Sequence, residues 1–128
     1  MRLLVHIIVS SALAVTLYPF YGFEALYLFL GGVLVDFDHY IWYFSKTRDV
    51  SLIRMVNYYD KGNFRDVLNI FHTIEFIILL SLYCLYFDMV PLYIGYVTHM
   101  SLDFIHIYQN KFTDKRADSL AMWIKRRV

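Results

Sequence analysis

The sequence predicts an all-α integral membrane protein, built as a bundle of four hydrophobic helices. Of its 128 residues, 59% are hydrophobic, and the mean hydropathy is +0.48. The hydrophobic residues form four runs, each close to the roughly 20 residues that an α-helix needs to cross about 30 Å of hydrocarbon. A soluble bundle would carry polar residues along the outer face of every helix, and these runs carry few. The length suits a single transmembrane domain that covers residues 1–128.

The four spans are expected at about residues 3–20, 23–44, 67–87 and 91–108. The first run follows Arg2, as the core of a secretory signal would. It continues to Tyr18 and contains His6, however, so we expect a helix that is retained in the protein. Pro91 suits the first turn of the fourth helix, where its missing N–H leaves no hydrogen bond unmade.

Two further segments are predicted to form short interfacial helices. In the middle loop, Ser51 can cap a helix with one apolar face, which consists of Leu52, Met55, Val56 and Tyr59. In the C-terminal tail, a similar face lies beside basic residues and consists of Leu120, Trp123 and Ile124. We expect both helices to lie on an anionic leaflet as anchors, with the capture of an anionic lipid as the alternative role.

The positions of Lys and Arg predict the orientation in the membrane. Residues 18–24 and 87–91 contain neither, whereas the middle loop holds Lys46, Arg48, Arg54, Lys61 and Arg65, and the tail holds Lys111, Lys115, Arg116, Lys125, Arg126 and Arg127. Because positively charged loops stay in the cytoplasm, we expect a multi-pass protein of the cell membrane with both termini cytoplasmic. The basic clusters adjoin the predicted helices and form no separate basic domain, so no nucleic-acid partner is expected. The single cysteine, Cys84, excludes a disulfide framework and a cysteine-based metal site.

Each hydrophobic run contains histidine or carboxylate side chains, which are costly in hydrocarbon unless they are paired, hydrated or bound to a cation. In chain order they are His6, then Asp36, Asp38 and His39, then His72 and Glu75, and finally His99, Asp103 and His106. Counted at about 1.5 Å per residue from the cytoplasmic ends, these residues fall in one layer of the inner leaflet. Spacings of three, four and seven residues also place most members of each group on one helical face. Asp38 faces elsewhere on an ideal helix, unless the second helix unwinds at that point.

Together these side chains predict a buried metal centre. Imidazole and carboxylate ligands without thiolates suit zinc, manganese or iron, with zinc favoured. The ligands outnumber the needs of one ion, so two or more ions are expected, with Asp36 or Asp103 as the bridging carboxylate. Asp38 and Glu75 are candidates for proton transfer, and Glu75 could instead orient a ligating histidine. Two roles are open for His106: to support a metal ligand, or to lie at the membrane interface.

At these residues the chain resembles the YdjM-like family of membrane-bound, metal-dependent hydrolases. The resemblance covers nearly the whole chain and rests on an early His6, on Asp36-Phe37-Asp38-His39 after Gly31-Gly32, on His72-Thr73, and on the motif from Gly95-Tyr96 to His99 and Asp103. That family is similar to the zinc-dependent phospholipase C and P1 nuclease group. The resemblance implies that the metal ligands are His6, Asp36, Asp38, His39, His72, His99 and Asp103. The chain departs from the family by lacking the Arg-Gly pair before the third-helix histidine, a charge that Arg65 could supply from another turn.

The leading hypothesis is therefore a membrane hydrolase in which a metal-activated water attacks a phosphoester, with a membrane lipid as the substrate. Amide cleavage would use the same groups. One alternative is a di-iron carboxylate bundle with redox activity, because Asp36-x-x-His39 and Asp103-x-x-His106 are spaced like the Glu-x-x-His pairs of such bundles. The other alternative is a carrier of divalent cations without enzymatic activity.

Overall fold

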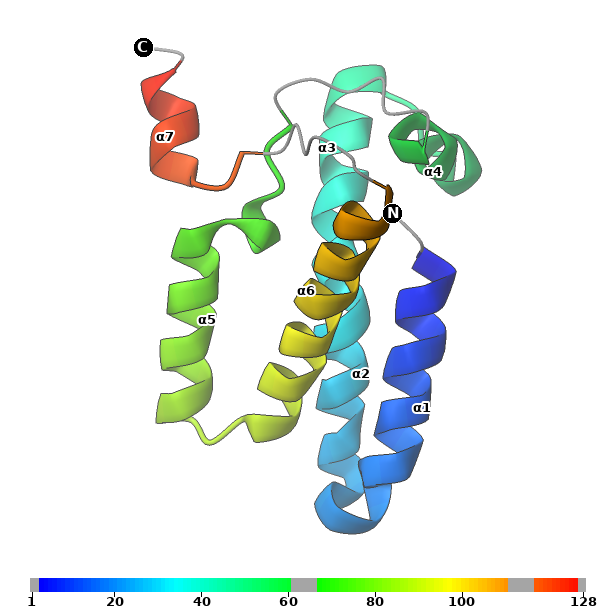
Figure 1. Cartoon of the computed structure of the whole chain (residues 1–128), viewed down its shortest axis with the longest axis vertical. Coiled ribbons are helices and arrows are strands. Elements are labelled where there is room, and N and C mark those ends of the chain that lie inside the picture. The colour runs from blue at the N-terminus through cyan, green and yellow to red at the C-terminus, as the bar shows by residue number, and fades with distance from the viewer. Residues whose placement is uncertain (1–2, 61–66, 111–116, 127–128) are drawn as a thin grey trace.

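The computed structural model describes residues 3–60, 67–110 and 117–126, and the regular elements in these ranges are all helical. The prediction of an all-α fold is confirmed. The chain begins with α1 (Leu3–Tyr21), reverses in the short 3-10 helix η1 (Gly22–Glu24), and returns as α2 (Ala25–Val33). Gly22 makes this reversal with a φ of +57°, in the left-handed region that glycine adopts without strain. Figure 1 shows α1 and α2 as an antiparallel hairpin.

The second predicted span is interrupted by a 3-10 turn, η2 (Leu34–Asp36), after which α3 (Phe37–Thr47) continues in the same direction. In this turn the N–H of Phe37 donates to the carbonyl of Leu34, three residues back. A 3-10 turn winds more tightly than an α-helix and changes which side chains share a face. Asp36, Asp38 and His39 are consequently all buried on the inner side, with exposures of 3–5%. Asp38 itself lies in the first turn of α3, so its inward position follows from the change of winding just before it and not from an unwound helix.

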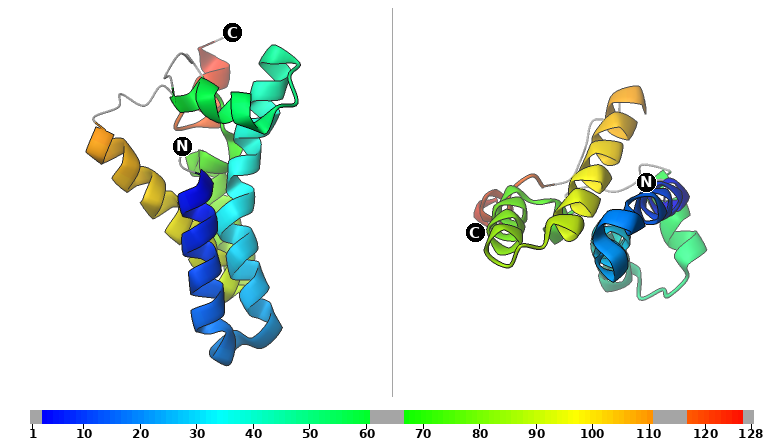
Figure 2. Two further views of the ribbon diagram at one scale, coloured as in Figure 1. Left: turned by 90° about the vertical axis from the view of Figure 1, so that its right-hand side faces the viewer. Right: turned by 90° about the horizontal axis from the view of Figure 1, so that it is seen from below.

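The helix α6 (Val90–Asn110) crosses between the α1–α2 hairpin on one side and α5 (Ile74–Tyr86) on the other (Figures 1 and 2). Its contact with α2 is made through glycines. A Cβ atom added to Gly95 would lie 2.0 Å from the carbonyl oxygen of Leu28, and one added to Gly31 would lie 2.4 Å from that of Leu92. A side chain at either position would therefore force the backbones apart, so these glycines permit the close packing of α2 and α6.

The third predicted span is shorter than expected. Only Ile74–Tyr86 is α-helical, so α5 has 13 residues and covers about 20 Å of the predicted 67–87 segment. Before it lies the 3-10 helix η3 (Ile70–His72), which the extended residue Thr73 separates from α5. Thr73 is the N-cap of α5, where its hydroxyl accepts from the N–H of Phe76 and donates to the carbonyl of Ile70. This cap starts the helix after His72 and leaves that histidine on a separate turn.

The middle-loop helix forms as α4 (Leu52–Asp60), with the Ser51 hydroxyl accepting from the N–H of Arg54. Its apolar face packs on the protein, however, and not on a leaflet alone. Met55 and Tyr59 are buried in a hydrophobic cluster with Tyr43 and Val67, whereas Leu52 remains exposed. The helix α4 is thus docked beside α3, and its interfacial position stays a prediction.

The C-terminal helix α7 (Leu120–Lys125) is fastened to the segment around η3. The N–H of Ala117 donates to the carbonyl of Val67, and the N–H of Ile74 donates to the carbonyl of Asp118. The Glu75 carboxylate accepts from the Ser119 hydroxyl and from the N–H groups of Leu120 and Ala121, at the start of α7. In addition, Trp123 meets Trp42 of α3 edge to face, with ring centroids 6.2 Å apart.

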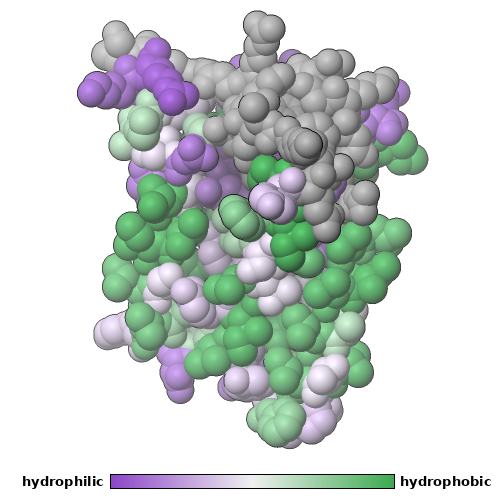
Figure 3. All heavy atoms as spheres, in the orientation of Figure 1, coloured by the Kyte–Doolittle hydropathy of each residue, from purple (hydrophilic) through white to green (hydrophobic). Residues whose placement is uncertain are grey.

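The described helices bury many polar side chains and expose many apolar ones. Buried positions of α1 and α6 include His6, Ser10, His99 and Asp103, while large apolar side chains such as Phe23 and Leu85 are more than 80% exposed. Figure 3 shows hydrophobic residues over the face formed by α5, α6 and α1, and hydrophilic residues at the end where α7 lies. Within the part of the chain that the structure describes, one helical stretch, Leu3–Thr47, is long and apolar enough to cross a membrane, and only 11% of its most apolar part is buried. That stretch includes the reversal at Gly22. The helix Ile74–Tyr86 is apolar but shorter.

Candidate metal centre

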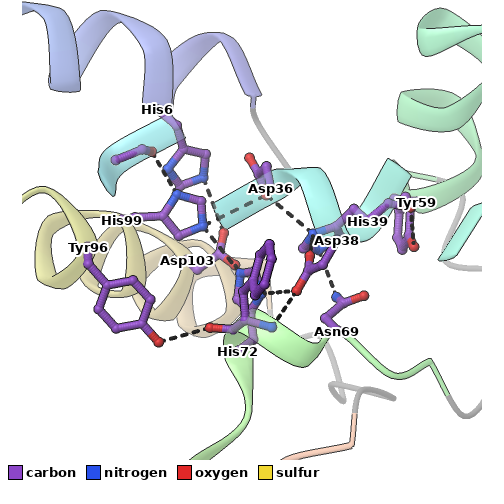
Figure 4. Close-up of polar contacts among 12 residues, drawn as sticks. His6, Asp36, Asp38, His39, Tyr59, Asn69, His72, Tyr96, His99 and Asp103 are labelled. Atoms are coloured by element: carbon purple, nitrogen blue, oxygen red, sulfur yellow. Dashed lines mark hydrogen bonds and ion pairs between the residues drawn. The ribbon is translucent and has the colours of Figure 1, made fainter. Parts of the chain in front are cut away.

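Four separate segments bring the predicted ligands together in the interior (Figure 4). The helix α1 contributes His6, the η2–α3 junction contributes Asp36, Asp38 and His39, the end of η3 contributes His72, and α6 contributes His99 and Asp103. The side chains that form ion pairs here are at most 10% exposed. The structure thus places all seven predicted ligands in one cluster, although no single helix holds more than three of them.

The first part of the cluster surrounds the Nε2 atom of His99. The rings of His6 and His99 are stacked, with centroids 4.1 Å apart. Asp103 reaches both neighbouring histidines, because its Oδ1 lies 3.2 Å from Nε2 of His6 and its Oδ2 lies 3.4 Å from Nε2 of His72. Oδ1 of Asp36 is 3.8 Å from Nε2 of His99. Three ring nitrogens and two carboxylates therefore point into one small volume.

In two of these rings, hydrogen bonds determine which nitrogen faces that volume. Nδ1 of His99 is 2.9 Å from the carbonyl oxygen of Gly32, which can only accept, so Nδ1 carries a proton. Nδ1 of His72 likewise donates to Oδ2 of Asp38 at 3.1 Å. In the neutral rings both Nε2 atoms then present lone pairs, yet they lie only 3.2 Å apart. Two lone pairs at this distance repel each other unless a cation lies between them.

A metal ion satisfies that requirement geometrically. Ligand atoms held about 2.0–2.1 Å from a tetrahedral ion are about 3.3 Å from one another. The 3.2 Å separation between the two Nε2 atoms and the 3.2–3.4 Å separations from Asp103 match this spacing. A hydrogen-bonded network alone would require an added proton on one ring to explain the same contact.

A second part of the cluster lies around His39. Its Nδ1 is 2.8 Å from Oδ1 of Asp38 and 3.4 Å from Oδ1 of Asp36. Nevertheless, among the described residues none of these three atoms has a hydrogen-bond partner with acceptable geometry, and neither does Oδ2 of Asp36. Buried carboxylate oxygens without donors are strongly unfavourable, because each loses its hydration without replacement. This group of side chains can therefore hold a cation beside the first part of the cluster.

Asp38 differs from Asp36 by having protein donors as well. Its Oδ2 accepts from the backbone N–H of Phe71 at 2.9 Å in addition to Nδ1 of His72. A carboxylate that accepts from the second nitrogen of a metal-binding histidine orients the ring and increases its basicity. Asp38 is therefore placed to support His72, with only Oδ1 directed toward His39.

Glu75 is not part of the cluster. Its carboxylate binds the first turn of α7. The three-residue spacing of His72 and Glu75 predicts neighbours on one helical face. The helix α5 begins only at Ile74, however, so the two residues do not share a helix. The catalytic position predicted for Glu75 is corrected to this structural contact. His106 belongs to none of the candidate ligand groups found among the described residues, and Arg65 lies outside those residues.

Asn69 lies at the cluster although it is not among the predicted site residues. It is fully buried, with its Nδ2 atom 2.9 Å from Nε2 of His39. Its only sequence signal is an amide inside a hydrophobic run. Tyr96, which belongs to the Gly95-Tyr96 motif, is also buried, and its hydroxyl donates to the carbonyl of Phe71, next to His72.

Comparisons with protein-family models, with curated proteins and with solved structures found no match for this chain. The donor set itself fits a divalent metal. Three overlapping triads have ligand atoms within 4.8 Å of one another, namely His6, Asp36 and His99, then Asp36, His39 and His72, then His72, His99 and Asp103. Asp36, His72 and His99 each belong to two triads, as expected where adjacent ions share or nearly share ligands.

Proposed function

We propose that the protein is an integral membrane, metal-dependent hydrolase that cleaves a phosphoester, with a lipid as the substrate class. The observation that supports this most strongly is the 3.2 Å approach of the His72 and His99 Nε2 atoms, both of which have their Nδ1 atoms engaged as donors. The resemblance to YdjM-like hydrolases supports the same assignment through the same residues.

Membrane insertion as four spans is supported by the distribution of polarity. The exposed apolar surface of α1, α2, α5 and α6 would be covered by lipid tails, and the glycine contacts between α2 and α6 are typical of helix packing in membranes. The short α5 is compatible with this arrangement because residues 67–73 pack against protein groups, with Val67, Asn69 and Thr73 buried. Non-helical backbone is tolerated at membrane depth only under such cover.

The expected orientation places the metal cluster on the cytoplasmic side. Lys46, Arg54 and Lys125 belong to α3, α4 and α7, whose basic ends lie at the same end of the molecule in Figure 1. The reversals at η1 and between α5 and α6 lie at the opposite end and contain no Lys or Arg. With positive residues in the cytoplasm, the cluster is nearer to the inner headgroups.

The chemistry follows from the arrangement of the donors. When bound, divalent ions would supply a Lewis acid that makes water nucleophilic near neutral pH and stabilises charge on phosphoryl oxygens. Asp36 and Asp103 would hold these ions between the histidines. Asp38 would retain the tautomer of His72 that directs Nε2 inward, and its Oδ1 remains the carboxylate oxygen best placed to accept a proton. Because Glu75 binds α7, the glutamate that a di-iron bundle requires from this helix is absent from the cluster.

A lipid substrate is supported by an apolar hollow beside the cluster. The hollow, of about 340 Å³, lies between α5 and α6 and is lined by Ile77, Tyr93, Tyr96, Val97, Met100, Ser101, Phe104 and Ile105. Tyr96 connects it to the cluster, because its hydroxyl binds the carbonyl of Phe71 beside His72. An acyl chain in this hollow would leave its headgroup near the ligands.

Metal removal tests the proposed activity. We expect the purified protein in detergent or nanodiscs to contain two or more divalent ions, to lose hydrolysis of its lipid substrate after chelation, and to recover it with added Zn²⁺. The measurements are elemental analysis and a panel of phospholipids and amide-linked lipids. A folded, metal-loaded protein that cleaves no member of a broad panel would contradict the enzyme assignment, and cation transport into liposomes would then favour a carrier.

Labelling with a membrane-impermeant thiol reagent tests the orientation. In a Cys84→Ala background, a cysteine at Asp88 is expected to be labelled in intact cells, whereas a cysteine at Lys46 should react only after permeabilisation. Both positions are exposed at opposite ends of the described molecule, so accessibility within the fold is comparable. Labelling of the Lys46 position from outside would reverse the proposed topology.

A further inference from the structure

Asn69 has an amide in an unusual environment. The residue is 0% exposed, and its Oδ1 has no hydrogen-bond partner among the described residues. A buried polar group without a hydrogen-bond partner destabilises the folded state, because it loses its hydration without replacement. A leucine of similar size would avoid this cost, so the amide at this position requires a reason other than packing.

The backbone at Asn69 shows that the side chain is not used for capping. Asn69 is the N-cap residue of η3, and its carbonyl accepts from the N–H of His72 at 3.0 Å. Asparagine at such a position normally accepts a backbone N–H with its side chain, but no such bond forms here. The amide instead lies against α3, with Nδ2 2.9 Å from Nε2 of His39.

This contact determines which nitrogen of the His39 ring is available to a cation. Nε2 is engaged by Asn69, while Nδ1 faces Oδ1 of Asp36 and Oδ1 of Asp38. Tyr59 holds the residue from a further direction, through an edge contact with the ring and a hydrogen bond to the His39 carbonyl. Nδ1 is therefore the only ring nitrogen that a cation beside Asp36 can use.

From this geometry we infer that Asn69 is a positioning residue that selects Nδ1 of His39 as the metal-binding nitrogen. The inference rests on the metal centre proposed above. The oxygen and nitrogen ends of an amide are nearly equal in shape, so a half-turn of the Asn69 amide brings Oδ1 to the same contact. Oδ1 then accepts from the Nε2–H group of His39, gains the partner that it lacks, and leaves the Nδ1 lone pair for the ion. Metal-binding histidines typically donate their second N–H to an oxygen in this way.

Zinc affinity of the full-length protein tests the inference. Replacing Asn69 with leucine should weaken binding by about 10–100-fold, the usual cost of losing a partner that orients a metal-binding histidine. Asn69→Asp, which keeps an oxygen acceptor, should retain affinity within a few-fold of the wild type. Asn57→Leu is the matched control, since Asn57 is exposed on α4. An Asn69→Leu protein that keeps its helical content and binds zinc like the wild type would overturn the inference.

Nitrogen-15 NMR of the histidine side chains gives a readout that does not depend on activity. In the zinc-loaded wild type, His39 should show a protonated Nε2 and a metal-bound Nδ1, and metal on Nε2 would refute the inference. If the wild type binds no zinc, the proposed metal centre is excluded. The spectra of the metal-free protein then still test whether Asn69 positions the His39 ring. A changed tautomer balance of His39 in Asn69→Leu would then support the positioning role, and an unchanged balance would exclude it.

Discussion

Replacing His99 or Asp103 with alanine is expected to remove bound metal and hydrolytic turnover together. His99 is fully buried, and its Nε2 faces that of His72, while Asp103 contacts both His6 and His72. Either change deletes a ligand from the centre of the cluster, so the loss of zinc affinity should exceed the about 10–100-fold that is usual for outer partners. Equilibrium dialysis with elemental analysis would measure the affinity, and lipid turnover would be followed in the same preparations.

Glu75→Gln is the informative comparison for these two variants. Glu75 is a half-buried carboxylate that binds the N-terminal turn of α7 and not the cluster. We expect this variant to keep its zinc affinity and to lose stability at the C-terminal segment, measurable as faster proteolysis after residue 117. A His99→Ala or Asp103→Ala protein that retained full metal content would show that these residues are not ligands.

Replacing Gly95 with alanine is expected to disrupt the packing of α6 against α2. The new Cβ would lie 2.0 Å from the carbonyl oxygen of Leu28 and 3.0 Å from the backbone nitrogen of Gly32, and neither atom can move without shifting the whole helix. Overpacking in a close-packed interior costs about 1–3 kcal/mol when side chains can adjust, and here the obstacle is backbone. The midpoint of thermal unfolding in detergent should fall accordingly.

The same experiment should also show a loss of metal. Gly32, which Gly95 contacts, provides the carbonyl that fixes the His99 ring. Ser101→Ala is the control on the same helix, because Ser101 is exposed and its substitution should change stability by less than about 0.5 kcal/mol. Equal unfolding midpoints for Gly95→Ala and Ser101→Ala would contradict the close approach of the two backbones.

Much of the cluster could be predicted from the sequence because the prediction needed only residue spacings and positions along each helix. Counting the rise along each helix puts His6 and His99 in one layer, and this needs no knowledge of how the helices pack. The i, i+4 spacing of His99 and Asp103 places both on one face of α6, and the structure directs both inward. Motif residues on continuous helices were therefore predicted well.

The predictions were wrong where the helix was not continuous. The capping hydroxyl of Thr73 starts α5 after His72, so the assumption of one helix through residues 67–87 misplaced Glu75. Asn69 could not be predicted at all, because its role depends on a contact with a residue 30 positions earlier in the chain. An isolated amide has no spacing pattern that identifies such a partner.

The attachment of residues 117–121 to the His72 segment has a consequence for the order of folding. Val67, Ile74 and Glu75 receive their hydrogen-bond partners from residues 117, 118 and 119–121, which follow α6 in the chain. All seven clustered side chains, from His6 to Asp103, are therefore synthesised before the residues that hold the His72 segment in place. The position of His72 is fixed last among them, which makes the closing of the cluster a late step of folding.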